Sequence, residues 1–169
     1  MVYSLPKVHK PDIPLRPIVS TINSITTELS RYLSKIIKPL TGKEPSFVKN
    51  SKALVNEIRN YCLELNEILV SYDVKDLFPS IPISDTLETL YNFLHTDTNL
   101  PSRTKPNPFH IVKLVSFCMQ DGNYFTFDNK FYKQSNGVPM GSPLSPVLAE
   151  IFMENVESQM FRTIDRQTF

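Results

Sequence analysis

The sequence predicts one mixed α/β domain of the α+β class, with amphipathic helices packed against a small antiparallel sheet. Apolar side chains recur at helical spacing in five segments of the chain. Residues 68–74 are rich in β-branched and aromatic side chains and contain no Gly or Pro, which is typical of a buried strand. Two aromatic runs within residues 123–133 flank Asp128-Asn129, a pattern that predicts a hairpin.

The first segment, residues 4–20, is basic and rich in proline. Proline forbids a helix here and favours extended segments around a turn. Lys7, Lys10 and Arg16 project from this frame. Arginine binds phosphate oxygens bidentately, so the segment is suited to gripping phosphates. A generic basic loop would have the same composition.

Helices are expected at about residues 24–38, 50–65, 84–94, 109–119 and 146–160, each with an apolar stripe most simply assigned to the core. The polar, proline-containing stretch 96–108 is expected to be a loop.

The strand predicted at residues 68–74 carries Asp73 at its far end. Successive side chains of a strand alternate between its faces, so Leu69, Ser71 and Asp73 share one face. Burying an ionised carboxylate costs several kcal/mol unless a cation or hydrogen-bond donors meet it. Asp73 therefore either faces solvent at the end of the strand or holds a positive charge.

Two further segments are unusual. The aromatic hairpin could stack on bases, but packing against neighbouring elements is the favoured interpretation. Residues 137–146 combine Gly137 and Gly141 with several prolines and with Ser142 and Ser145, and they lead into a helical stripe. Glycine lets the backbone approach a ligand closely, and the amides of a helix start attract anions. This loop would fit beneath a nucleotide or a template base.

Composition bounds the possible classes of protein. The 169 residues, 41% hydrophobic and 21% charged, suit one globular domain with no membrane partner. Cys62 and Cys118 show no paired spacing, so both are expected to be buried thiols in a reducing compartment. Residues 1–52 hold nine Lys or Arg against three acids. This basic segment indicates a polyanionic partner, although a solvated basic surface would look the same.

The motifs, taken in order, resemble those of a reverse transcriptase. Residues 5–10 and 16–20 look like fingers motifs, residues 73–78 look like the palm strand with the first catalytic aspartate, and residues 137–146 look like the template and nucleotide loop. The amino-acid sequences of these segments, and of Tyr-Phe-Thr-Phe-Asp-Asn-Lys-Phe-Tyr at 124–132, are most similar to those of Penelope-like retroelements. The resemblance covers essentially the whole chain.

The resemblance implies an incomplete right-hand polymerase fold, with residues 1–66 as the fingers segment and residues 67–169 as a partial palm. It implies an RNA-directed DNA polymerase with an RNA template, a DNA primer and deoxynucleoside triphosphates as partners. Mg²⁺ or Mn²⁺ would be the cofactor, and the protein would be intracellular and nuclear.

Roles are carried over by position. Asp73 and the carbonyl of Val74 would bind two metal ions, and Phe78 would exclude the ribose 2′ hydroxyl. The triphosphate would be held by Lys7 or Lys10 together with Arg16. Residues 137–146 are called the glycine loop below. The floor under the templating pair would be formed by four of its residues, namely Gly137, Met140, Gly141 and Ser142. Asp76 is expected to be an exposed partner on the other side of the strand rather than a second metal ligand.

Two departures from the family pattern stand out. Met140 occupies the position where many members have Gln, so the hydrogen bonds of that Gln are in doubt. The aromatic-x-Asp-Asp turn, which carries the remaining metal ligands, does not occur. We therefore expect a fragment with little polymerase activity, an unpaired sheet edge and poor solubility. A non-catalytic nucleic-acid-binding remnant, or a structural domain in which Asp73 is only a polar strand end, are the alternatives.

Overall fold

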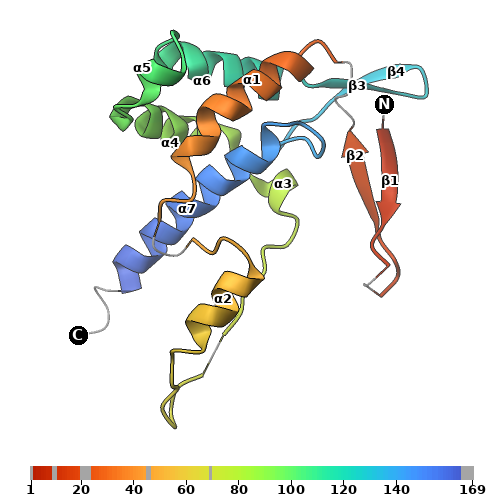
Figure 1. The fold of residues 1–169 in the computed structure, drawn as a ribbon. Coiled ribbons are helices and arrows are strands. Elements are labelled where there is room, and N and C mark those ends of the chain that lie inside the picture. Colours follow the sequence, from red (N-terminus) through yellow and green to blue (C-terminus); the bar gives the residue numbers. More distant parts are fainter. Residues whose placement is uncertain (1, 9–10, 20–23, 45–46, 69, 165–169) are drawn as a thin grey trace.

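The computed structural model describes residues 2–8, 11–19, 24–44, 47–68 and 70–164. Helices and two small antiparallel sheets alternate along the chain, which confirms the predicted α+β class (Figure 1). The elements are β1 (Val2–Pro6), β2 (Leu15–Val19), α1 (Thr27–Ile37), a 3₁₀ turn (Lys38–Leu40), α2 (Ser51–Ile58), α3 (Leu77–Ser80), α4 (Ile83–Thr96), α5 (Leu100–Arg103), α6 (Pro108–Ser116), a π-helical turn (Phe117–Asp121), β3 (Tyr124–Phe127), β4 (Lys130–Lys133) and α7 (Ser145–Ile164).

Four helices, α1, α4, α6 and α7, enclose the hydrophobic core. In sequence they are far apart, but α4 packs on both α6 and α7, and α1 packs on α6 (Figure 1). The apolar stripes predicted on these helices lie inside. The most deeply buried side chains are Leu33, Ile37, Leu90, Leu94, Ile111, Val115, Leu148 and Ile151. Each contributes roughly 1.5–3 kcal/mol relative to exposure, so this cluster is what holds the domain together.

The N-terminal segment is a hairpin, as predicted. Strands β1 and β2 pair antiparallel, with Leu5 opposite Arg16, and the Lys7 N–H donates to the Pro14 carbonyl at 2.9 Å. Proline is tolerated because, among the described residues, each strand pairs with only one other strand and so lies at a sheet edge. Lys10 lies outside the described residues.

The predicted central strand does not form. Residues 70–74 have no regular secondary structure, and Ile68 and Tyr72 are 82% and 91% exposed. A strand exists only when its N–H and C=O groups pair with a neighbour, and no segment among the described residues pairs with this one. Leu69 itself is not described.

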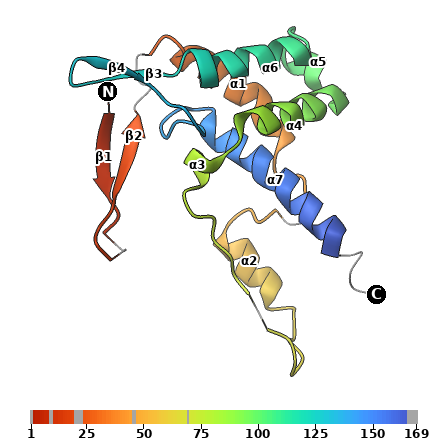
Figure 2. The same cartoon turned by 180° about the vertical axis from the view of Figure 1, so that it is seen from behind.

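The second predicted helix is also wrong in its length and in its burial. Helix α2 ends at Ile58 rather than near residue 65, and none of its eight residues is buried. The helix begins at Ser51, close to the expected start at residue 50, and the Asn50 side chain caps it by accepting from the Ala53 N–H at 2.9 Å. Figures 1 and 2 show α2 apart from the four core helices, so its apolar stripe has no core face against which to pack.

Three smaller expectations also change. The stretch 96–108 contains the short helix α5. Cys118 is buried, and burial raises the pKa of its thiol, whereas Cys62 is exposed. The predicted hairpin forms from β3 and β4 around Asp128-Asn129, but most of its side chains are exposed rather than packed. Among the described helices, none has the length and apolar character that a bilayer crossing requires.

A buried carboxylate joins α7 to the turn after α1. Glu154 is 9% exposed and accepts a hydrogen bond from the Gly42 N–H at 2.5 Å. Burial raises the pKa of Glu154, and the charges of Glu44, Glu150 and Glu157 add to this effect, while the Gly42 N–H opposes it. A raised pKa means that folding favours the protonated acid, so this stabilisation is present at acid pH and is lost as the pH rises through the raised pKa.

We predict that Glu154→Gln increases the free energy of unfolding near neutral pH, because glutamine removes the buried charge and keeps the carbonyl acceptor. The increase should shrink below the ordinary Glu pKa of about 4.3, and urea unfolding at both pH values measures it. The matched control is Glu88→Gln, which removes an exposed carboxylate of α4 and should not show this pattern. An equal gain at both pH values would contradict the prediction.

Candidate active site

A cavity of about 990 Å³ brings together three segments that are distant in the sequence. The N-terminal hairpin contributes Lys7 and Arg16. The segment before α3 contributes Asp73, Val74 and Phe78. The glycine loop contributes Met140, Gly141 and Ser142. Most of the residues singled out from the sequence therefore line one cavity, while their individual roles stay predictions.

Gly137 does not line this cavity; it packs against the backbone of α3. Its φ is +67°, and an added Cβ would lie 2.3 Å from the Phe78 carbonyl oxygen and 2.4 Å from that of Pro79. The next residue, Val138, donates its N–H to the Phe78 carbonyl at 2.9 Å. Only glycine permits both the left-handed backbone and this backbone contact. One end of the loop is thereby fixed to α3.

The other end of the loop is fixed to the N-terminal hairpin. The Val19 N–H, at the end of β2, donates to the Met140 carbonyl at 3.0 Å. Gly141 has a φ of +120°, and a Cβ there would lie 2.5 Å from the Val19 carbonyl oxygen. The loop therefore ties the basic hairpin to the segment that carries Asp73.

Two buried serines hold the loop against the start of α7. The Ser145 hydroxyl donates to the Pro139 carbonyl at 2.6 Å, and the Ser142 oxygen accepts from the Leu144 N–H at 3.3 Å. Both side chains are at most 5% exposed. Their hydroxyls set the shape of the turn, in agreement with the prediction that serine starts this helix.

The turn into α3 places the Asp76 carboxylate at the cavity, close to Lys7. Asp76 adopts a left-handed backbone with φ +52°, and its carboxylate lies 3.5 Å from the Lys7 ammonium nitrogen. It is an exposed ion-pair partner, as predicted, but it lines the same cavity as Asp73 instead of pointing to the opposite side. The alternation of side chains expected for a strand does not hold because the strand is absent and the chain turns at residues 75–76.

The described residues that line the cavity include Asp73 and Asp76 but no complete set of metal ligands. Within the described residues, no three His, Cys, Asp or Glu side chains lie close enough together to hold a metal ion. Mg²⁺ is commonly held by one or two carboxylates together with substrate phosphates and water. Asp73, with the adjacent Val74 carbonyl, fits one such ion shared with a triphosphate. The described donor set is too small for two ions held by the protein.

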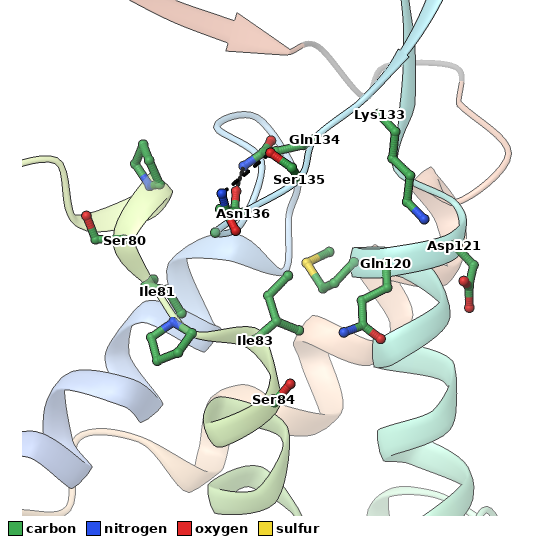
Figure 3. A pocket seen from close by; sticks show the side chains of 14 residues that line it. Ser80, Ile81, Ile83, Ser84, Gln120, Asp121, Lys133, Gln134, Ser135 and Asn136 are labelled. Carbon is green, nitrogen blue, oxygen red and sulfur yellow. Dashed lines mark hydrogen bonds between the residues drawn. The ribbon is translucent and has the colours of Figure 1, made fainter.

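A second cavity of about 1010 Å³ lies beside the first part of the glycine loop, between α3, the start of α4 and the end of β4. Figure 3 shows both apolar and uncharged polar side chains around it, and the Gln134 side-chain amide donates to the Asn136 backbone carbonyl at 2.7 Å. Asp121 and Lys133 are its charged lining residues. We assign the functional site to the first cavity because Lys7, Arg16 and the aspartates converge there.

Comparison with known families agrees with this geometry. A family model described as "Reverse transcriptase (RNA-dependent DNA polymerase)" matches residues 8–168. The chain belongs to the reverse transcriptase family. No curated protein matches this reverse transcriptase chain. Members of the family use divalent metal ions such as Mg²⁺, nucleic acid template and primer, and deoxynucleoside triphosphates.

Several lining residues of this reverse transcriptase cavity were not singled out from the sequence. Ile18 lies two residues beyond Arg16, and Tyr3 is its cross-strand partner. Residues two apart on a strand share a face, and directly opposed residues do too. Combining Arg16 with the hairpin register would have identified both. Pro143 and Pro146 also line the cavity and follow directly from the position of the loop.

We predict that Gly137→Ala destabilises the protein far more than Gly42→Ala does. Both positions have a left-handed backbone, which costs roughly 1–2 kcal/mol for alanine. At Gly42 the nearest atom to an added Cβ is in the Phe47 ring at 3.3 Å, whereas at Gly137 it is a backbone carbonyl oxygen at 2.3 Å. Urea unfolding should therefore show a loss of about 3 kcal/mol or more for Gly137→Ala. Equal losses would show that the close approach to Phe78 is unimportant.

Proposed function

We propose that this chain provides the nucleotide-binding side of a reverse transcriptase active site. The observation that carries the proposal is the convergence of Lys7, Arg16 and Asp73 on one cavity whose wall is the glycine loop. Arg16 and Lys7 supply the positive charge that a triphosphate requires, and both side chains come from a hairpin stiffened by proline.

Asp73 and the Val74 carbonyl would hold Mg²⁺, which neutralises triphosphate charge and lowers the pKa of a primer 3′ hydroxyl when bound. The ion pair between Lys7 and Asp76 keeps the ammonium group at the cavity until phosphate oxygens compete for it. Because Asp76 is half exposed, the pair is weak enough to exchange.

Phe78 is proposed to select deoxynucleotides, because Phe78 lines the same cavity as Asp73 and its ring would occupy the space of a 2′ hydroxyl. Met140, Gly141 and Ser142 would lie under the templating pair, with Gly137 fixing them from behind. Residues 1–66 would act as the fingers and residues 67–169 as part of the palm. The motif wording favours a Penelope-like retroelement as the source.

The proposal predicts Mg²⁺-dependent binding of dATP to the isolated chain. Asp73→Asn should abolish the Mg²⁺ dependence, and Arg16→Gln should weaken binding about 10- to 100-fold, as expected for loss of a charge-assisted hydrogen bond. Isothermal titration with and without Mg²⁺ measures both effects. Arg31→Gln, on α1 and ion-paired with Glu28, is the matched control and should bind like the wild type. Binding that is indifferent to Asp73 and Arg16 would exclude this site.

A second prediction concerns sugar selection. Phe78→Ala should reduce the preference for dATP over ATP by about tenfold, the effect of removing a few methylene-sized groups from a pocket. Competition binding measures the ratio. Phe93→Ala removes another partly buried ring packed on the same core and controls for lost stability. An unchanged ratio in Phe78→Ala would remove Phe78 from this role.

We further propose that catalysis by this chain alone is weak, because Asp73 is the only carboxylate of the described cavity lining that is not engaged with Lys7. Primer extension on an RNA template with Mg²⁺ should be near background. Efficient extension that disappears in Asp73→Asn would contradict this proposal. Nucleic acid binding without any nucleotide binding would favour a non-catalytic binding remnant instead.

A further inference from the structure

The β3–β4 hairpin is a two-stranded ribbon, and most of its aromatic side chains are exposed. Strands 124–127 and 130–133 pair in register, with Phe125 opposite Tyr132. Asp128 and Asn129 both have positive φ, 49° and 55°, which matches the two-residue turn that suits the twist of a hairpin. The backbone is therefore fixed by local pairing, independently of what its side chains contact.

Exposure of these side chains is high. The exposed fractions are 58% for Tyr124, 60% for Phe127, 79% for Phe131 and 41% for Tyr132. Large aromatic rings are normally buried, and contiguous exposed apolar surface on a soluble domain marks an interaction site. The packing role expected for this hairpin from the sequence is therefore wrong for most of its rings.

Three of the rings, Phe125, Phe127 and Tyr132, contact one another on one face of the ribbon. Phe125 and Tyr132 stack with centroids 5.7 Å apart and an interplanar angle of 19°, and Phe127 meets Tyr132 edge-on at 6.5 Å. Contacts among neighbouring rings limit their rotamers, so a flat ligand would bind with little further loss of side-chain entropy.

Each of the two lysines of the hairpin lies opposite a ring. Lys133 lies opposite Tyr124, with its ammonium nitrogen 5.7 Å from the centroid of that ring, and Lys130 lies opposite Phe127. Directly opposed residues share a face, so each face of the ribbon carries both a ring and a cation. Asp128, at the tip of the turn, is the only acid in the hairpin.

A ligand that matches this surface combines flat π faces with regularly spaced negative charge. Unpaired bases on a phosphate backbone have both properties, whereas the bases of a duplex are stacked on one another and offer no free faces. We propose that the Tyr124–Lys133 hairpin is a stacking platform for single-stranded nucleic acid. The site lies outside the nucleotide cavity, and nothing in the catalytic proposal requires it.

The position of the hairpin fits this role and links it to the proposed function. Strand β3 contacts β1, whose hairpin carries Lys7 and Arg16, and β4 leads within a few residues to Gly137 (Figures 1 and 2). A single-stranded nucleic acid that leaves the nucleotide cavity along β1 would next contact the aromatic β3–β4 hairpin. This part of the inference rests on the proposed function.

The test measures binding of fluorescein-labelled oligo(dT) and oligo(U) to the full chain by fluorescence anisotropy. Phe131→Ala and Tyr124→Ala should each weaken binding by about 5- to 100-fold, since stacking contributes roughly 1–3 kcal/mol per base. Phe131→Trp should retain affinity, because a stacking face is kept. Lys133→Gln should lower the slope of log affinity against log salt by about 0.7, the value for one phosphate contact to a single strand. Comparing the two oligonucleotides shows whether RNA or DNA is preferred.

Tyr61→Ala is the matched control, since Tyr61 is 70% exposed and lies far from the hairpin in the sequence, and it should bind like the wild type. Thermal unfolding of each variant checks that the fold is retained. Equal affinity of the hairpin variants and the wild type would overturn the proposal. So would a change in oligomeric state confined to those variants, because the ribbon would then be covered by a second copy. If the wild type binds Mg²⁺ and dATP but no oligonucleotide, this inference fails while the proposed function stands.

Discussion

The arrangement of the site depends on a loop that is held by backbone contacts at both ends. Gly137 lies against the carbonyls of Phe78 and Pro79, and Gly141 lies against that of Val19. Neither contact leaves room for a Cβ atom, so the side chain is excluded by geometry rather than by polarity. Through these contacts the N-terminal hairpin, the segment around Asp73 and the start of α7 take fixed positions around one cavity.

The electrostatics of the cavity follow from that arrangement. Arg16 and Lys7 come from a basic hairpin, whereas Asp73 and Asp76 come from a stretch more than fifty residues later. Bringing opposite charges to one cleft produces a site that can accept a metal ion and a polyphosphate together. The weak ion pair between Lys7 and Asp76 neutralises part of the positive charge of Lys7 and leaves the Asp76 side chain half exposed.

The stretch that includes α2 and residues 60–74 shows that an apolar sequence pattern leads to burial only when another surface packs against it. Its valines, leucines and tyrosines resemble those of the buried helices, yet Leu65, Ile68 and Tyr72 are almost fully exposed. Hydrophobic periodicity states which face would be buried, but burial itself requires a second surface. The β3–β4 hairpin differs because its two strands pair with each other, so its structure forms even though its rings remain outside.

The sequence by itself determined the local elements: the proline-stiffened hairpin, the four core helices, the Asp128-Asn129 turn and the glycine loop. Each depends on contacts between residues close in the chain, through φ restriction, capping or periodic burial. It also determined the family, because three motifs stand in the right order. Tertiary structure alone decided that Ile68 and residues 70–73 form no strand, that Asp76 turns toward Lys7, and that α2 and the aromatic ribbon stay exposed. Those outcomes depend on which surfaces meet across the chain, and pairing or burial between distant segments is not encoded in any local pattern.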